Sequence, residues 1–244
     1  MGMKASKSYI TDWEHADGHV KQYQTLDRMD PFNHHETLIL SHENQREFKV
    51  RRSNEVLYFT KAVPNTAFWF DVCRTYEEPI LQVRGHPWKK QWDILSYHIP
   101  SYVGQDVIRD ESSNNHPLYR KARIQIDWKL DRAEVQLCRP LLTEITNNDE
   151  KTTEVWSDPI LIYYDADRIY GNKGQTYRPD DQDTLISYLE MSADHKYSFL
   201  HLAKNCDIAL HVILTVISSI IHCNNSPFLS RSTDAFMPPE GNLL

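Results

Sequence analysis

The stretch that decides the fold of this 244-residue chain runs from Tyr197 to Cys223. It begins with a strand-like run, Tyr197-Ser-Phe-Leu-His-Leu202, and passes through Ala203-Lys-Asn-Cys206 into Asp207-Ile-Ala-Leu-His-Val-Ile-Leu-Thr-Val-Ile-Ser-Ser-Ile-Ile221. No other apolar run in the sequence is as long. Ile and Val suit strands as well as helices, but a run of this length favours a helix, which we place at residues 207–222.

The expected helix is apolar on almost all sides, so it is either buried or in a membrane. A membrane span needs roughly 20 apolar residues, and this run is shorter and is interrupted by polar side chains. We therefore predict a buried core helix and no transmembrane span. Asp207 or Asn205 suits the helix start, and Asn224, Asn225 and Pro227 supply stop signals.

A polar stripe follows one side of this helix, formed by His211, Thr215, Ser218 and His222 at spacings of three or four residues. One interpretation is a polar track that faces a groove or a water-filled gap. The other is a helix edge near solvent, or hydroxyls bonded back to the preceding turn.

Upstream of the helix, short runs of β-forming residues separated by turn residues predict about a dozen strands. These runs are Glu36–Ser41, Glu47–Arg52, Glu55–Thr60, Thr66–Cys73, Pro79–Arg84, Gln91–His98, Ala122–Leu130, Ala133–Arg139, Thr153–Trp156, Pro159–Tyr164, Thr184–Met191 and Tyr197–Leu202. Polar loops are expected at 104–119 and 171–183. The predicted fold class is mainly β: a closed antiparallel β-barrel of about twelve strands that encloses one C-terminal hydrophobic α-helix.

The chain is expected to divide into three parts. Residues 1–30 are polar, with isolated Trp13, Tyr23 and Leu26, and form an extension that docks at one point. Residues 31–225 form the barrel, and residues 226–244 form a flexible tail. Gly2 and Ser6 fit a short N-myristoylation pattern, for which an ordinary polar start is the alternative.

The amino-acid composition restricts the kinds of partner and the cellular compartment that we expect. The net charge of −7, from 27 basic and 34 acidic residues, argues against a dedicated nucleic-acid binder. The cysteines are scattered, without metal-type spacing, at Cys73, Cys138, Cys206 and Cys223. With no apolar segment following the N-terminal residues, a reducing, cytoplasmic location is expected.

Several motifs occur in an order similar to that of LURP-one-related proteins, which belong with tubby C-terminal-like and phospholipid scramblase-like proteins. The motifs are Lys204-Asn-Cys-Asp-Ile-Ala-Leu210 at the helix entry and, upstream, Phe48-Lys-Val-Arg-Arg52, Leu57-Tyr-Phe-Thr60, Phe70-Asp-Val72, Pro79-Ile-Leu-Gln-Val-Arg84 and Trp92-Asp-Ile94. The resemblance covers residues 36–223 and implies a closed barrel around one hydrophobic helix. Asn205 replaces the family's usual Gly, which is tolerable because Asn accepts a left-handed conformation.

The resemblance also implies binding of membrane lipid, since tubby proteins recognise phosphoinositide headgroups through basic side chains. Their own signature motifs are absent, and the best local substitute is the basic-aromatic segment Arg84-Gly-His86-Pro-Trp88-Lys89-Lys90-Gln-Trp92. The candidate lipid-binding residues are Arg84, His86, Trp88, Lys89, Lys90, Arg51 and Arg52, and Arg120, Lys121 and Arg123 join them if the fold brings them together. The alternative is an ordinary solvated turn with Trp92 in the core.

Catalytic and metal chemistry finds little support. Asp180, Asp181 and Asp183 lack the spacing of a calcium loop, and the lipidated cysteine cluster of scramblases is missing, so scrambling is not supported. The pairs His15 with His19 and His34 with His35 suggest metal ligands only weakly, because the first pair lies in the polar extension. We expect no catalytic residue, cofactor or metal.

The expected function is non-enzymatic, peripheral binding of a cytoplasmic monomer to anionic, phosphoinositide-type membrane lipid. The alternative is a protein-interaction scaffold of LURP-one-related type with no lipid activity.

Overall fold

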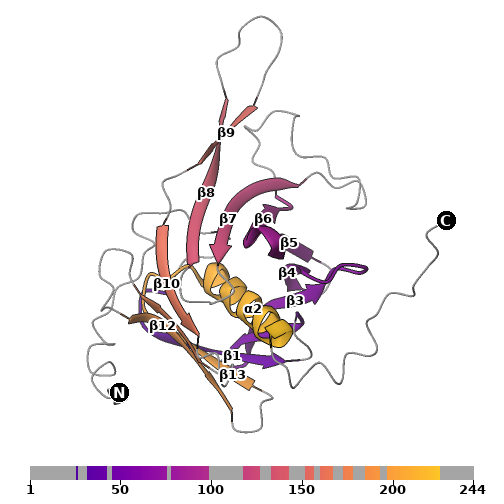
Figure 1. Cartoon of the computed structure of the whole chain (residues 1–244). Helices are drawn as coiled ribbons and strands as arrows, with labels where there is room; N and C mark the ends of the chain where they lie inside the picture. The colour runs from indigo at the N-terminus through magenta and orange to yellow at the C-terminus, as the bar shows by residue number, and fades with distance from the viewer. Residues whose placement is uncertain are drawn as a thin grey trace, which may run out of the picture.

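A computed structural model describes residues 26, 32–42, 46–75, 78–98, 118–126, 133–142, 152–156, 160–166, 173–177, 185–192 and 197–225. This part of the chain is mainly β: a 13-stranded antiparallel sheet with one C-terminal α-helix, α2 (Ile208–Asn225). The strands are β1 (Glu36–His42), β2 (Phe48–Arg52), β3 (Glu55–Ala62), β4 (Trp69–Thr75), β5 (Glu78–His86), β6 (Gln91–Ser96), β7 (Tyr119–Ile126), β8 (Ala133–Leu142), β9 (Thr152–Trp156), β10 (Ile160–Ala166), β11 (Lys173–Tyr177), β12 (Leu185–Met191) and β13 (Tyr197–Leu202). Figure 1 shows α2 in the middle, with strands on several sides of it.

The strand order is β10-β11-β12-β13-β1-β2-β3-β4-β5-β6-β7-β8-β9, and β10 also pairs with β8 through Ile160–Ile162. Because consecutive neighbours are antiparallel, their turns alternate between two ends of the sheet. We call the end where β13 finishes and α2 begins the helix-entry end; it also holds the β2–β3 turn. The opposite end, which we call the far end, holds the β3–β4 loop and the β5–β6 turn.

The core forms between α2 and the inward face of the strands. Helix residues Val212, Ile213, Val216 and Ile217 have no exposed surface, and they belong to one apolar cluster with strand residues such as Phe70. A helix that is apolar on every side must have apolar neighbours on every side, and the sheet provides them. The predicted buried core helix is therefore confirmed; the described residues contain no helix long and apolar enough to cross a membrane.

The start of α2 is held by one buried carboxylate. Asp207 accepts a hydrogen bond from the Leu210 backbone N–H at 3.0 Å, as an N-cap residue does. Its second oxygen accepts the Leu26 backbone N–H at 2.6 Å, and the Lys121 ammonium donates to the Leu26 carbonyl. Asn205 adopts φ 59°, the left-handed conformation expected of this residue. The Leu26 side chain is 1 % exposed, so this residue is anchored beside the start of α2.

Most predicted strands occur with boundaries shifted by a few residues, but one region was predicted wrongly. The expected loop 171–183 contains β11, which pairs with β10 and β12. Its sequence Lys-Gly-Gln-Thr-Tyr carries little β-signal, so pairing with its two neighbours decides its structure. α2 also continues to Asn225, beyond the predicted end at residue 222. Trp13, Tyr23, residues 226–244, Gly2, His15, His19 and the Asp180 cluster lie outside the described residues.

Burial of α2 predicts the effect of a charge in its centre. Ile213→Asp places a carboxyl group where it has no water, and we expect a loss of several kcal/mol in unfolding free energy, or no folding. Ile213→Val, the matched control, removes one methylene and costs about 0.5–1.5 kcal/mol. Urea unfolding followed by circular dichroism measures both. Similar midpoints for Ile213→Asp and the parent chain would contradict the burial.

The double role of Asp207 predicts a second stability effect. Asp207→Ala removes the helix cap and leaves the buried Leu26 N–H without its acceptor, which together cost about 2–4 kcal/mol. Asp207→Asn retains one acceptor oxygen and should lose less than Asp207→Ala. Amide hydrogen exchange at Leu26 should accelerate in both variants. Equal protection of that amide in the parent and in Asp207→Ala would argue against the link.

Candidate functional site

The β5–β6 turn at the far end carries the exposed basic and aromatic side chains. It is a single 3₁₀ turn, η3 (Pro87–Lys89), followed by Lys90. The Trp88 side chain is 97 % exposed, and Lys89 and Lys90 are exposed beside it. The other large apolar side chain exposed among the described residues, Tyr197, is 44 % exposed. Trp88 therefore has little packing role in the fold described here.

The backbone of Lys90 has a conformation that usually selects another residue. Its φ is 53°, in the left-handed region where Gly, Asn and Asp are preferred. Asn65 and Asn205 fill two similar positions in this chain, with φ of 60° and 59°. A lysine at such a position has a conformational cost that Gly would not have.

The turn is held rigidly at its base. The Lys90 carbonyl accepts the Ile126 N–H at 3.0 Å, and the Gly85 N–H donates to the Phe68 carbonyl at 3.1 Å. Gly85 lies against the buried ring of Trp92, which packs edge-on against Phe68 with ring centroids 6.5 Å apart. These contacts hold η3 in one position, so Trp88 and Lys89 are presented without a large ordering cost.

Arg84 was predicted as a surface ligand, and its location corrects this. Its side chain is 9 % exposed; Nε donates to Gln82 Oε1 at 2.6 Å, and the guanidinium lies 4.6 Å from the centre of the Trp69 ring. Gln82 in turn donates to Asp71 and Tyr97, at 3.0 and 2.9 Å. The Tyr97 hydroxyl also donates to Asp71, at 3.1 Å. Burial raises the pKa of Asp71, and the hydrogen bonds from Gln82 and Tyr97 offset only part of this rise. Arg84 belongs to a buried network and not to the exposed turn.

The Asp93 carboxylate on β6 contacts three polar side chains near the turn, those of Arg123, Gln91 and His86. Its carboxylate accepts Arg123 Nε at 2.9 Å and Gln91 Nε2 at 3.0 and 3.1 Å, and His86 Nε2 lies 3.8 Å away. Arg123 and the half-buried His86 are thus already close to a negative charge. Sequence reasoning missed Asp93 and the Asp71 network, because alternating polar residues in a strand normally indicate a solvated face.

Arg51 and Arg52 lie at the opposite end of the sheet from η3. They precede the β2–β3 turn at the helix-entry end, so the structure does not bring them to the predicted site. Arg52 donates to Glu36 at 2.7 Å and lies 4.8 Å from the centre of the Phe32 ring. Arg51 is exposed. Neither residue is near Trp88.

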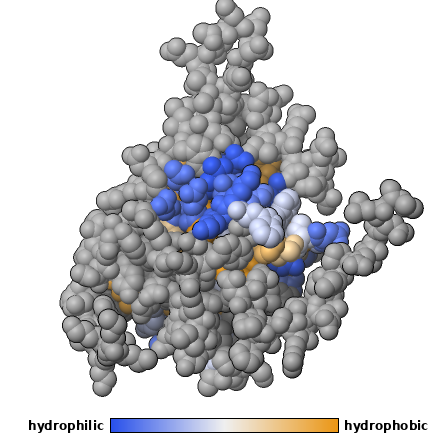
Figure 2. Space-filling view, in the orientation of Figure 1, coloured by the Kyte–Doolittle hydropathy of each residue, from blue (hydrophilic) through white to orange (hydrophobic). Residues whose placement is uncertain are grey.

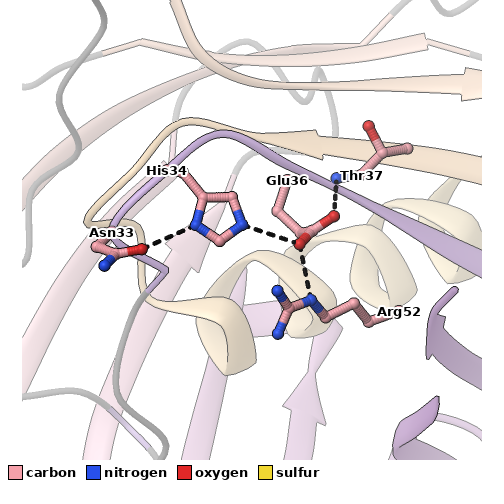
Figure 3. Close-up of polar contacts among 5 residues, drawn as sticks. All are labelled: Asn33, His34, Glu36, Thr37 and Arg52. Carbon is pink, nitrogen blue, oxygen red and sulfur yellow. Dashed lines mark hydrogen bonds and ion pairs between the residues drawn. The ribbon is translucent and has the colours of Figure 1, made fainter.

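Figure 3 shows the polar chain around Glu36, which receives bonds from Arg52, from the Thr37 N–H and from His34, with Asn33 on the other side of the His34 ring. Burial raises the pKa of Glu36, but the bonds from the Thr37 N–H, His34 and Arg52 lower it below its usual value. Among the described residues, no group of three His, Cys, Asp or Glu side chains is placed to hold a metal ion.

Two residues of the helix stripe, His211 and Thr215, are buried and have polar contacts within the fold. His211 Nδ1 is 3.0 Å from Ser187 Oγ on β12, and the Thr215 hydroxyl donates back to the His211 carbonyl at 2.9 Å. The Thr215 bond therefore matches the second interpretation of the stripe, in which a hydroxyl bonds back to the preceding turn.

The Cys73 thiol is not an activated nucleophile. Burial, and then the nearby Asp71 carboxylate, raises its pKa to about 11.

The candidate site is smaller than the one predicted: Trp88 and Lys89 on η3 and Lys90 directly after it, with His86 before it. In the view of Figure 2, hydrophilic residues gather over the region where Figure 1 places β6 and β7, beside a paler patch. No model of a protein family matches this chain, and no curated protein matches it. The resemblance to LURP-one-related proteins stays a prediction.

The packing of Gly85 predicts how the turn depends on its base. A Cβ atom there would lie 2.5 Å from Trp92 and 2.8 Å from Phe68, so Gly85→Ala should destabilise the chain by about 1–3 kcal/mol. Lys90→Gly, as a control in the same turn, removes the left-handed cost and should leave stability equal or higher. Thermal unfolding measures both. A neutral Gly85→Ala variant would contradict the tight packing.

Proposed function

We propose that this protein binds anionic membrane lipid peripherally through η3, with Trp88 at the membrane interface and Lys89 and Lys90 on lipid phosphates. The observation that carries the proposal is a tryptophan with 97 % of its surface exposed, placed beside two exposed lysines on a braced turn. Tryptophan favours the headgroup region of a bilayer, because its ring is largely apolar and carries one polar N–H group.

The charges of the protein limit how tightly it can bind an anionic membrane. Each basic side chain near an anionic leaflet contributes on the order of 1 kcal/mol, and the two lysines with Trp88 therefore support weak binding. The net charge of −7 opposes approach to such a membrane. Binding should therefore fall with salt and should favour headgroups that carry several phosphates.

We also propose that the sheet closes into a barrel and that the protein is related to LURP-one-related proteins. The pairing of β8 with β10, which lie far apart in the strand order, supports closure into a barrel around α2. An antiparallel sheet packed around one buried C-terminal helix supports the proposed resemblance to LURP-one-related and tubby C-terminal-like proteins. We further propose a non-enzymatic, monomeric, cytoplasmic protein, in keeping with the buried free thiols of Cys73 and Cys206.

Lipid binding is tested by co-sedimentation with phosphatidylcholine vesicles, with and without a phosphoinositide, at low and physiological salt. The parent chain should sediment with phosphoinositide vesicles, and more strongly at low salt. Lys89→Glu with Lys90→Glu should weaken binding by at least about tenfold, because two attractions become repulsions. Trp88→Ala should also weaken it, with less dependence on salt.

The matched control reverses two charges elsewhere. Arg51→Glu with Lys204→Glu gives the same change in net charge near the helix-entry end, where both residues lie, and should leave binding nearly unchanged. Equal loss in both double variants would show that net charge, and not η3, governs binding. No sedimentation of the parent chain under any condition would reject the lipid proposal and favour the protein-interaction scaffold.

A further inference from the structure

We propose that the β3–β4 loop, residues 63–68, forms a second contact with the same lipid surface, so that the bilayer is met by two neighbouring turns. This inference rests on the proposed function and extends it, because η3 alone then accounts for only part of the contact. Residue Lys61, exposed near the end of β3, supplies the charge of this second contact.

The two turns are adjacent and lie at the same end of the sheet. β3, β4 and β5 are consecutive neighbours, and both the β3–β4 loop and η3 fall at the far end. The Gly85 N–H bonds to the Phe68 carbonyl at 3.1 Å, and Trp69 stands opposite Arg84 in the register. A flat surface that touches η3 therefore approaches the β3–β4 loop as well.

The composition of both turns suits an anionic, partly apolar surface. The segment Lys61-Ala-Val-Pro-Asn-Thr-Ala-Phe68 has no acidic residue, and neither has Arg84-Gly-His-Pro-Trp-Lys-Lys-Gln-Trp92. Neither turn therefore carries an acidic side chain that would repel anionic lipid.

Two carboxylates lie beside the base of the loop, and both have partners on the strands. Asp71, opposite Lys61 in the register, accepts a hydrogen bond from Gln82 at 3.0 Å. Glu47 accepts the Ala62 N–H at 3.4 Å. Neither carboxylate belongs to the loop itself, so the loop meets a surface without a negative charge of its own.

The tip of the loop presents small apolar groups. Pro64 and Ala67 are exposed, whereas Val63 and Phe68 are half-buried. Such side chains enter the headgroup region without a large desolvation cost, and the neighbouring Lys61 remains at the level of the phosphates. The arrangement repeats that of η3, where an apolar tip also lies beside lysine.

The loop is preorganised, as a rigid contact requires. The Arg46 guanidinium donates to the Thr66 carbonyl and, at 3.2 Å, to the Trp69 carbonyl. The Thr66 hydroxyl donates to the Val63 carbonyl at 2.8 Å, and Asn65 takes the left-handed conformation that the turn needs. Little ordering is therefore needed when the loop meets a surface.

Site-specific labelling tests whether the loop reaches the membrane. Ala67→Cys, labelled with an environment-sensitive fluorophore, should show a blue shift in emission on mixing with phosphatidylcholine vesicles that contain a phosphoinositide. Asn54→Cys in the exposed β2–β3 turn, at the helix-entry end, is the control and should show no shift. Unsubstituted protein labelled in parallel corrects for the native cysteines.

Charge reversal tests the contribution of Lys61 to affinity. Lys61→Glu should weaken vesicle binding by about fivefold or more, whereas Arg51→Glu, with the same charge change, should have little effect. If the parent binds and Lys89→Glu with Lys90→Glu abolishes binding, but neither the fluorophore on the Ala67→Cys variant nor Lys61→Glu responds, the proposed function stands and the second contact is rejected. If the parent does not bind these vesicles, both are rejected.

Discussion

The burial of α2 is the constraint on which the rest of the structure depends. Apolar side chains cover nearly every side of this helix, so a single packed layer leaves part of it in water, and strands must meet it from several directions. Each strand then contributes one inward face to the same core. The helix start needs a fixed position too, and the Asp207 carboxylate provides it by bonding both Leu210 within the helix and Leu26 far away in the sequence.

Structural demands also determine which basic side chains of the segment 84–92 are buried and which are exposed. Gln82, Arg84 and Asp93 are polar and nevertheless buried. Arg84 donates to Gln82 and lies against the Trp69 ring, Gln82 donates to Tyr97, and Asp93 accepts a bond from Arg123. Buried polar groups are stable only when such partners exist. The basic character of the segment 84–92 thus separates into a structural arginine and exposed lysines. The exposed Trp88 lies in the turn, where folding requires no side chain of its size.

Local features were predictable because a few consecutive residues determine them. The cap at Asp207, the left-handed Asn205, the turn at 53–54 and the apolar helix all follow from conformational preferences within one segment. The exposed Trp88 and Lys89 were predictable for the same reason, since a Pro-initiated polar turn between two strands points outward. The helix end was misjudged because asparagines that often stop a helix also fit its last turn.

The sequence by itself determined a strand-rich chain with one buried helix and a basic-aromatic turn. The tertiary structure alone decided that β11 is a strand, that Arg84 is buried beside Trp69, and that Arg51 lies at the end opposite Lys89. Each of these depends on which strands become neighbours and in which register, and pairing with a neighbouring strand outweighs local preference there. Such pairings join residues on different strands, so the pattern within one segment does not contain them.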